Sequence, residues 1–250
     1  MLYDLFDLAL FSCMHYCSIT MSHLVFDIET AGEDFDAMDA LTQDALAHWV
    51  EKGDTQKLQE IKDKTSLSPL TGEIVTIGVY DVEKKKGVVY FQCPDKKVEP
   101  FTEGEIDYKP CTEKSMLEQF WHGALRYSAF VSFNGRMFDA PYMIVRSAIH
   151  GIKPTVDLMS NRYLSKQWNS ALHIDLYDQL TFYGASSSKG SLHMWTRAFG
   201  ITSPKVDGMS GKDVGAYFKQ KKYREIAQYN ARDLGATAQL FDYWNRYIKP

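Results

Sequence analysis

The stretch Leu24-Val25-Phe26-Asp27-Ile28-Glu29-Thr30 alternates apolar side chains with two carboxylates. This is the period of a β-strand, so Asp27 and Glu29 share one face, while the apolar residues 24, 26 and 28 share the other. Two carboxylates about 6 Å apart repel by roughly 3 kcal/mol at an effective dielectric of about 20. A divalent cation reverses that sign, and ligation by carboxylates alone suits Mg²⁺ or Mn²⁺. An exposed edge strand whose acids face water fits the same pattern equally well.

The composition predicts a single globular domain with one sizeable core, because the chain has 250 residues, 45% of them hydrophobic, and only eight prolines. The formal charge of −4 gives no general affinity for nucleic acid. Residues 153–225, however, carry eleven bases against six acids, which indicates either a local grip on phosphates or a solvated helix face. Four cysteines without zinc-finger or disulfide-framework spacing predict a reducing, cytoplasmic setting.

The first twenty residues are apolar, but they include Asp4 and Asp7 and contain no lysine or arginine. This composition fits neither a secretory signal nor a transit peptide, and the segment is too interrupted to cross a membrane. We therefore expect residues 1–20 to be a non-structural N-terminal extension ahead of Met21. Residues 21–250 are then expected to form one domain that needs no membrane.

Periodicity and turn signals predict strands and helices after the first strand. The predicted strands are 73–82, 87–92 and 129–133, with a strand or strand-to-loop edge at 173–180. The predicted helices begin at Thr112 and span 139–150, 191–199 and 223–247. Residues 93–112 carry three prolines and read as a loop. Antiparallel pairing followed by alternating strands and helices predicts an α/β fold, a mixed central sheet with flanking helices.

An acidic, helical insertion is predicted at about residues 31–72. Its apolar side chains Met38, Leu41, Ala45 and Trp49 recur at helical spacing and would form one face. Because this segment directly follows Glu29, we hypothesise that it covers or borders the site formed by the two acids.

Two further acidic motifs stand at the ends or on the faces of predicted elements. Asp139 follows the turn signal Asn134-Gly135 and opens the predicted helix 139–150. Tyr229 and Asp233 lie four residues apart, on one face of the last predicted helix. Taken alone, Asp139 is more often an N-cap than a metal ligand, and the other pair reads as a surface tyrosine and a surface acid.

In this order, the three motifs resemble those of the DEDD superfamily of 3′–5′ exonucleases, in the subclass with a tyrosine four residues before the last aspartate. The likeness is closer still to the proofreading domain of family-B DNA polymerases and to stand-alone bacterial exonucleases related to it. The second motif of that family is matched here by Asn134-Gly135-x-x-Phe138-Asp139-x-Pro141-Tyr142. The resemblance covers about residues 22–245, and the ordered set of three motifs is far more specific than any one of them.

The resemblance implies a ribonuclease H-like fold with Asp27 and Glu29 on its first, central strand. It implies two divalent ions, Mg²⁺ or Mn²⁺, with Asp27 touching both. Glu29 and Asp233 would complete the ion that holds the attacking water, and Asp139 would support the second ion. Tyr229 would orient that water; with a reference pKa of about 10, a tyrosine is a poor base at neutral pH but a good hydrogen-bond partner. The implied reaction removes nucleoside monophosphates from the 3′ end of single-stranded DNA or RNA.

The substrate is expected to be held by aromatic stacking on unpaired bases and by basic side chains on phosphates. The candidates are Asn134, Phe138, Tyr142, His193 and Lys205, although large aromatic residues near a core strand are more often packing.

Two other functions remain open at this stage. A catalytically silent nucleic-acid-binding module on the same fold would have lost at least one of the four acids, and all four are present. A ribonuclease H-type endonuclease would lack the terminal tyrosine motif and would cut internally. A dinucleotide-binding enzyme is excluded because no glycine fingerprint follows the first strand.

Overall fold

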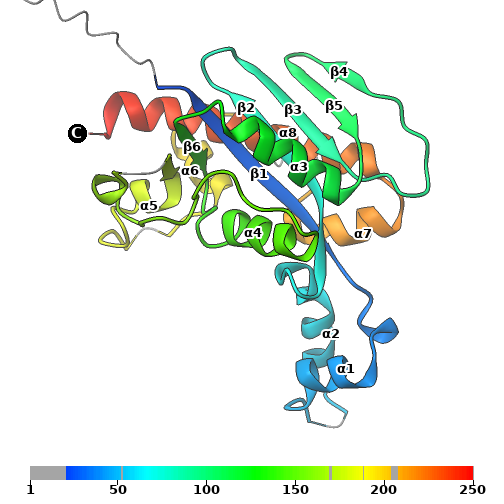
Figure 1. Ribbon diagram of the computed structural model, residues 1–250. Coiled ribbons are helices and arrows are strands. Elements are labelled where there is room, and N and C mark those ends of the chain that lie inside the picture. Colours follow the sequence, from blue (N-terminus) through cyan, green and yellow to red (C-terminus); the bar gives the residue numbers. More distant parts are fainter. Residues whose placement is uncertain (1–20, 52, 169–170, 188, 204–207, 250) are drawn as a thin grey trace, which may run out of the picture.

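The computed structural model describes residues 21–51, 53–168, 171–187, 189–203 and 208–249. Its centre is a mixed sheet with the strand order β4-β5-β3-β2-β1-β6-β7 (Figure 1). The strands are β1 (His23–Gly32), β2 (Gly72–Asp81), β3 (Lys86–Phe91), β4 (Phe101–Glu103), β5 (Ile106–Pro110), β6 (Ala129–Ser132) and β7 (Leu172–Asp175). The acid-bearing strand β1 is central, since it pairs with β2 antiparallel on one side and with β6 parallel on the other. The predicted extension, residues 1–20, lies outside the described residues.

Helices cover both faces of this sheet (Figure 1). The helices that bear on the site are α3 (Glu113–Ala124), α4 (Asp139–Ile149), α5 (Leu176–Leu180), α6 (Leu192–Ala198), α7 (Val214–Lys219) and α8 (Tyr223–Tyr247). Helices α3 and α4 pack on one face, where the side chains of Leu24, Phe26 and Ile28 are buried. Helix α8 packs on the opposite face against β1 and β2, with α5, α6 and α7 beside it. The alternation predicted for β1 is therefore confirmed, and its acids lie on the α8 face.

One sequence expectation about secondary structure was wrong, and another is confirmed only in its first part. Residues 93–112 were expected to be a loop, but β4 and β5 form a hairpin in this segment, at the edge of the sheet. The alternation Ile106, Tyr108, Pro110 was the available signal, and the proline is tolerated because it is the last residue of β5, beyond the residues that pair with β4. Residues 173–180 are a strand only to Asp175, whose side chain accepts the Tyr177 N–H and so begins α5.

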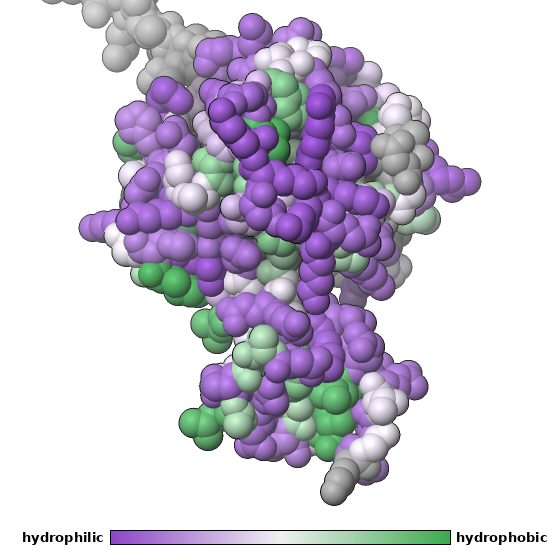
Figure 2. Space-filling model, turned by 90° about the vertical axis from the view of Figure 1, so that its right-hand side faces the viewer, coloured by the Kyte–Doolittle hydropathy of each residue, from purple (hydrophilic) through white to green (hydrophobic). Residues whose placement is uncertain are grey.

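The segment between β1 and β2 contains the helices α1 (Ala40–Ala47) and α2 (Thr55–Lys64), which project from the end of the sheet (Figure 1). No described residue of either helix is buried, and Leu41 is 83% exposed. The apolar face predicted from Met38 to Trp49 is thus not a core face. Figure 2 shows hydrophobic side chains at the surface of this lower lobe. The described part of the chain has no helix long and apolar enough to cross a membrane.

A buried ion pair joins the elements that carry the site. Glu113, the first residue of α3, accepts two hydrogen bonds from the Arg146 guanidinium, at 2.8 and 2.7 Å. It also accepts the backbone N–H of Ile74 at 2.8 Å and lies 2.7 Å from His150 Nε2. The carboxylate therefore holds the end of α4 and the start of β2 together, and α4 begins with Asp139.

We expect Glu113→Ala to lower the free energy of unfolding by about 3–5 kcal/mol, because the substitution leaves the Arg146 guanidinium buried without its partner. Urea denaturation measures the change. Glu99→Ala is the matched control, since Glu99 pairs with Lys97 at the surface and both side chains are largely exposed. Equal stabilities for the two variants would contradict this role of Glu113.

Candidate active site

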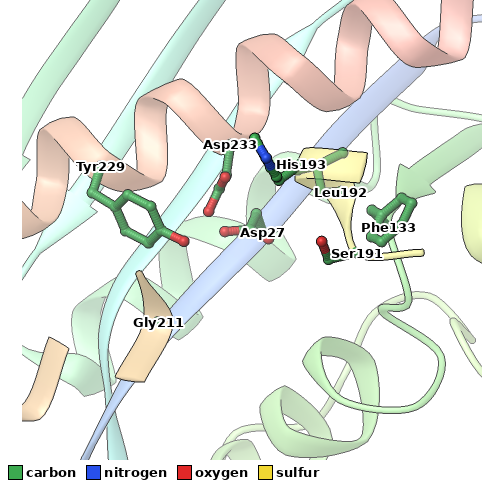
Figure 3. A pocket seen from close by; sticks show the side chains of 8 residues that line it. All are labelled: Asp27, Phe133, Ser191, Leu192, His193, Gly211, Tyr229 and Asp233. Carbon is green, nitrogen blue, oxygen red and sulfur yellow. The ribbon is translucent and has the colours of Figure 1, made fainter. Parts of the chain in front are cut away.

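Three carboxylates from opposite ends of the chain meet on the α8 face of the sheet. Asp27 and Glu29 extend from β1, and Asp233 extends from the middle of α8. One ligand oxygen from each residue lies within 4.8 Å of the others. Figure 3 shows Asp27 and Asp233 facing one another across the pocket. Oxygen ligands at this spacing match what a hard divalent cation such as Mg²⁺ or Mn²⁺ requires.

Burial makes this cluster unusual for a group of like charges. Glu29 and Asp233 are buried, and Asp27 is half-buried at the floor of the pocket. The register of β1 against β2 shifts between Glu29 and Thr30, which is a local irregularity of the β-bulge kind. Such irregularities re-aim side chains next to active sites. Here the shift comes directly after the second acid of the strand.

The fourth predicted acid, Asp139, lies beside this group and is held by the main chain of β1. It is the first residue of α4, and the cap position belongs to Phe138, so the common N-cap interpretation does not apply. Its Oδ1 accepts the backbone N–H of Ile28 at 2.9 Å. The structure thus places the Asp139 carboxylate against the peptide group that joins Asp27 to Ile28. It is not one of the three residues whose ligand atoms lie mutually within 4.8 Å.

Asp175 orients the turn that leads to Asp139, and the sequence motifs did not identify it. Its carboxylate accepts the backbone N–H of Asn134 at 2.8 Å and that of Arg136 at 3.0 Å. Asn134 has a left-handed φ of 63°, which asparagine adopts more readily than most residues. The signal available in the sequence was an aspartate at the end of β7. This strand neighbours β6, so its end lies next to the turn that follows β6.

Tyr229 stands one helical turn before Asp233 on α8 and is buried at the pocket. Figure 3 shows its hydroxyl directed toward Asp27 and Asp233. Burial, followed by the charge of Asp233, raises the pKa of Tyr229 above its usual range. The phenol therefore stays protonated at neutral pH and acts as a hydrogen-bond donor, not as a base.

Burial also governs the charge state of the acids. It raises the pKa of the Asp27 and Glu29 carboxyls well above their usual range, and the neighbouring acids raise both further. Burial raises the pKa of Asp139 to about 7, although the hydrogen bond from the Ile28 N–H opposes this shift. Without a cation, the cluster therefore retains protons that exposed carboxylates would have lost. A divalent ion that binds there must displace them.

A pocket of about 230 Å³ opens onto these acids. It is lined by Asp27, Phe133, Ser191, Leu192, His193, Gly211, Tyr229 and Asp233 (Figure 3). His193, predicted as a substrate-side residue, is thus in the pocket, and its Nδ1 lies 2.7 Å from Ser203 Oγ. Phe133 and Gly211 were not predicted. Phe133 immediately precedes the motif that begins at Asn134, and Gly211 lies in none of the three motifs. No described residue of the segment between β1 and β2 lines the pocket, so the pocket lining does not support the hypothesis that this segment covers or borders the site.

The other substrate-side candidates lie elsewhere. Tyr142 is only 2% exposed in the core, and its hydroxyl donates to the carbonyl oxygens of Ser66 and Ser68, so its expected stacking on bases is corrected to packing. Phe138 packs against Tyr142, with 5.3 Å between the ring centroids, and does not line the pocket. Asn134 is half-buried and is likewise not among the lining residues. Lys205 lies outside the described residues.

We expect the Tm of an Asp139→Asn variant, measured in EDTA, to exceed the wild-type Tm increasingly from pH 5 to pH 8. The pKa of Asp139 is raised from 3.8 to about 7, so the native state holds a proton that the unfolded chain releases. Asp139 therefore destabilises the native state progressively as the pH rises from about 4 to about 7. Asparagine does not ionise and has no such effect.

A gain of at least about 2–4 °C at pH 8 would correspond to about 1 kcal/mol in a chain of this size. Asp44→Asn on the exposed side of α1 is the control and should show a flat difference. A gain that shrinks with rising pH would contradict the assignment.

Comparisons with known proteins bear on this geometry. A family described as "Predicted 3'-5' exonuclease related to the exonuclease domain of PolB" matches residues 83–246. Among solved structures, the chain is similar to the family B DNA polymerase from the hyperthermophilic archaeon Pyrobaculum calidifontis, with a TM-score of 0.58 and 17% identity over 90% of this chain. It spans 24% of that polymerase, and the likeness shows a shared ribonuclease H-like fold. No curated protein matches the sequence significantly. The chain therefore belongs to the family of predicted 3′–5′ exonucleases related to the polymerase B exonuclease domain.

Proposed function

We propose that this protein is a metal-dependent 3′–5′ exonuclease that releases nucleoside monophosphates from the 3′ ends of single-stranded DNA or RNA. The observation that carries the proposal is the meeting of Asp27, Glu29 and Asp233 within 4.8 Å, with Asp27 and Asp233 lining an open pocket. Membership of the exonuclease family supports the reaction class. A cytoplasmic location, and a single exonuclease domain over residues 21–250, are parts of the same proposal.

Each acid has a proposed role toward two Mg²⁺ or Mn²⁺ ions. Asp27 would contact both ions, Glu29 and Asp233 would complete one site, and Asp139 would support the other. When bound, such a pair stabilises both the attacking and the leaving oxygen of an in-line displacement at phosphorus. Asp139 suits a supporting role because one of its oxygens is already engaged by the Ile28 N–H.

Tyr229 is proposed to position the attacking water. The residue is buried at the pocket, its hydroxyl is directed toward Asp27 and Asp233 (Figure 3) and it is protonated at neutral pH, so it can orient a water without removing a proton from it. Phe133 and His193 line the same pocket and are proposed to contact the terminal nucleotide. An aromatic ring there offers a stacking surface that tolerates any base.

The reaction is tested with 5′-labelled single-stranded DNA and RNA, each with Mg²⁺ or Mn²⁺. We expect a ladder that shortens stepwise from the 3′ end, and no cleavage of a circular single strand, which has no end. Cleavage of the circle would indicate the endonuclease. Binding without any shortening, measured by fluorescence anisotropy, would indicate the silent binding module.

Asp27→Ala should lower turnover by at least about 10³-fold, the upper range for loss of one electrostatic contact to the transition state. The same variant should be at least as stable as wild type in EDTA, because repulsion among the acids is relieved. Initial rates and thermal unfolding measure the two effects. Asp44→Ala, far from the pocket lining, should retain wild-type turnover; an Asp27 variant that still turns over normally would end the proposal.

Tyr229→Phe should reduce kcat by roughly 10–100-fold, the range expected when a reacting group is misplaced by about 1 Å. Its Mn²⁺ affinity should stay near the wild-type value, because the phenol is not a proposed ligand. Steady-state kinetics and calorimetric Mn²⁺ titration separate the two quantities. Tyr247→Phe is the control on the same helix, since Tyr247 is largely exposed. An unchanged kcat in the Tyr229 variant would contradict the positioning role.

A further inference from the structure

Gly78 in β2 lies directly opposite Asp27 in the register of the two central strands. Its φ is not in the left-handed region, so the backbone conformation does not require glycine here. A Cβ at this position would lie 2.0 Å from Asn230 Oδ1 and 2.6 Å from Leu234 Cδ1. A glycine inside a strand often marks such a close approach. The absence of a side chain at Gly78 therefore leaves the space that the Asn230 side chain of α8 occupies.

Asn230 contacts the metal-site acid directly. The residue is completely buried, and its Nδ2 donates to Asp27 Oδ2 at 2.8 Å. Its other polar atom, Oδ1, is buried without a hydrogen-bond partner among the described residues. A buried carbonyl oxygen without a donor destabilises the fold. An apolar side chain of similar size would avoid that penalty, so stability alone does not account for an asparagine at this position.

We propose that Asn230 is a positioning residue for Asp27 and that Gly78 is its necessary companion. The amide binds one oxygen of the Asp27 carboxylate and fixes the orientation of the group. The second oxygen is then left to face a divalent cation together with Glu29 and Asp233. The inference rests on the proposed function in one respect, which is that Asp27 holds such an ion. Neighbours that orient a ligand in this way typically change metal affinity or activity 10–100-fold when they are lost.

A purely structural role and a positioning role predict different behaviour for Asn230→Leu. This variant keeps the number and branching of the side-chain heavy atoms and removes both the donor and the unpaired oxygen. If Asn230 only fills space or supports the fold, Mn²⁺ affinity stays at the wild-type value. If it orients Asp27, the variant is at least as stable as wild type in EDTA and yet binds Mn²⁺ 10–100-fold more weakly.

The experiment is a calorimetric titration of the full chain with Mn²⁺ alone, without nucleic acid, together with thermal unfolding in EDTA. Thr237→Val is the matched control, because Thr237 is also a buried polar residue of α8, seven positions further on and thus on nearly the same side of the helix. Its Mn²⁺ affinity should equal that of wild type. A wild-type Mn²⁺ affinity in Asn230→Leu would overturn the inference.

Gly78→Ala tests the proposed role of Gly78. It also gives an independent result if Asn230→Leu does not fold. The added methyl displaces Asn230, so Gly78→Ala alone should weaken Mn²⁺ binding. In the Asn230→Ala background the contact with the Asn230 amide is gone, and the remaining close atom is the end of the flexible Leu234 side chain, 2.6 Å away, so Gly78→Ala should then cause no further loss of Mn²⁺ affinity. Additive losses in the double variant would overturn the pairing of the two residues.

The outcomes separate the two proposals. Loss of Mn²⁺ affinity in the Asn230 variants, with no hydrolysis by wild type, would support the positioning role and overturn the exonuclease. Hydrolysis by wild type, with unchanged Mn²⁺ affinity in the variants, would support the exonuclease and overturn the positioning role.

Discussion

Repulsion among buried carboxylates is the constraint on which the rest of the site depends. Asp27, Glu29 and Asp233 place ligand oxygens within 4.8 Å of one another in a largely buried pocket. Charges of one sign cannot remain together in such a place unless protons or a cation neutralise them. The acids cannot turn away to water, because β1 is the central strand and is packed on both faces. The fold thus enforces a cluster that must be neutralised by protons or by a cation.

Two of the four acids are oriented by a group from another element. Asp139 is held by the Ile28 N–H of β1, and Asp27 is held by the Asn230 amide of α8. The turn before Asp139 is itself held by Asp175, at the end of β7. Fixing ligands from outside their own element keeps them in place before substrate arrives, which is what electrostatic preorganisation requires. The buried pair of Glu113 and Arg146 extends the same principle to α4 as a whole.

The lobe formed by α1 and α2 is built differently from this rigid centre. It contributes no residue to the pocket lining, and its described helices bury no side chain. Its acidic character would repel a nucleic acid backbone. The pocket lies between the sheet and α8, and Phe133 and the start of α6 line the side of it away from Tyr229 and Gly211 (Figure 3).

The sequence by itself determined the features that depend on the periodicity of a single strand or helix. The period of two placed Asp27 and Glu29 together on β1, and the helical period placed Tyr229 one turn from Asp233 in a helix whose bounds, 223–247, were predicted as observed. The motifs, through their resemblance to a known family, also identified the fold and the exonuclease class that the family match supports.

Only the tertiary structure decided which side chains meet. It buried Tyr142 in the core, formed a hairpin from the expected loop 93–112, and inserted Asn230 into the space that Gly78 leaves. The physical reason is that a local pattern records how one strand or helix repeats. The packing of α8 on β2 depends instead on the shapes of two surfaces far apart in the chain, and neither segment contains that information alone.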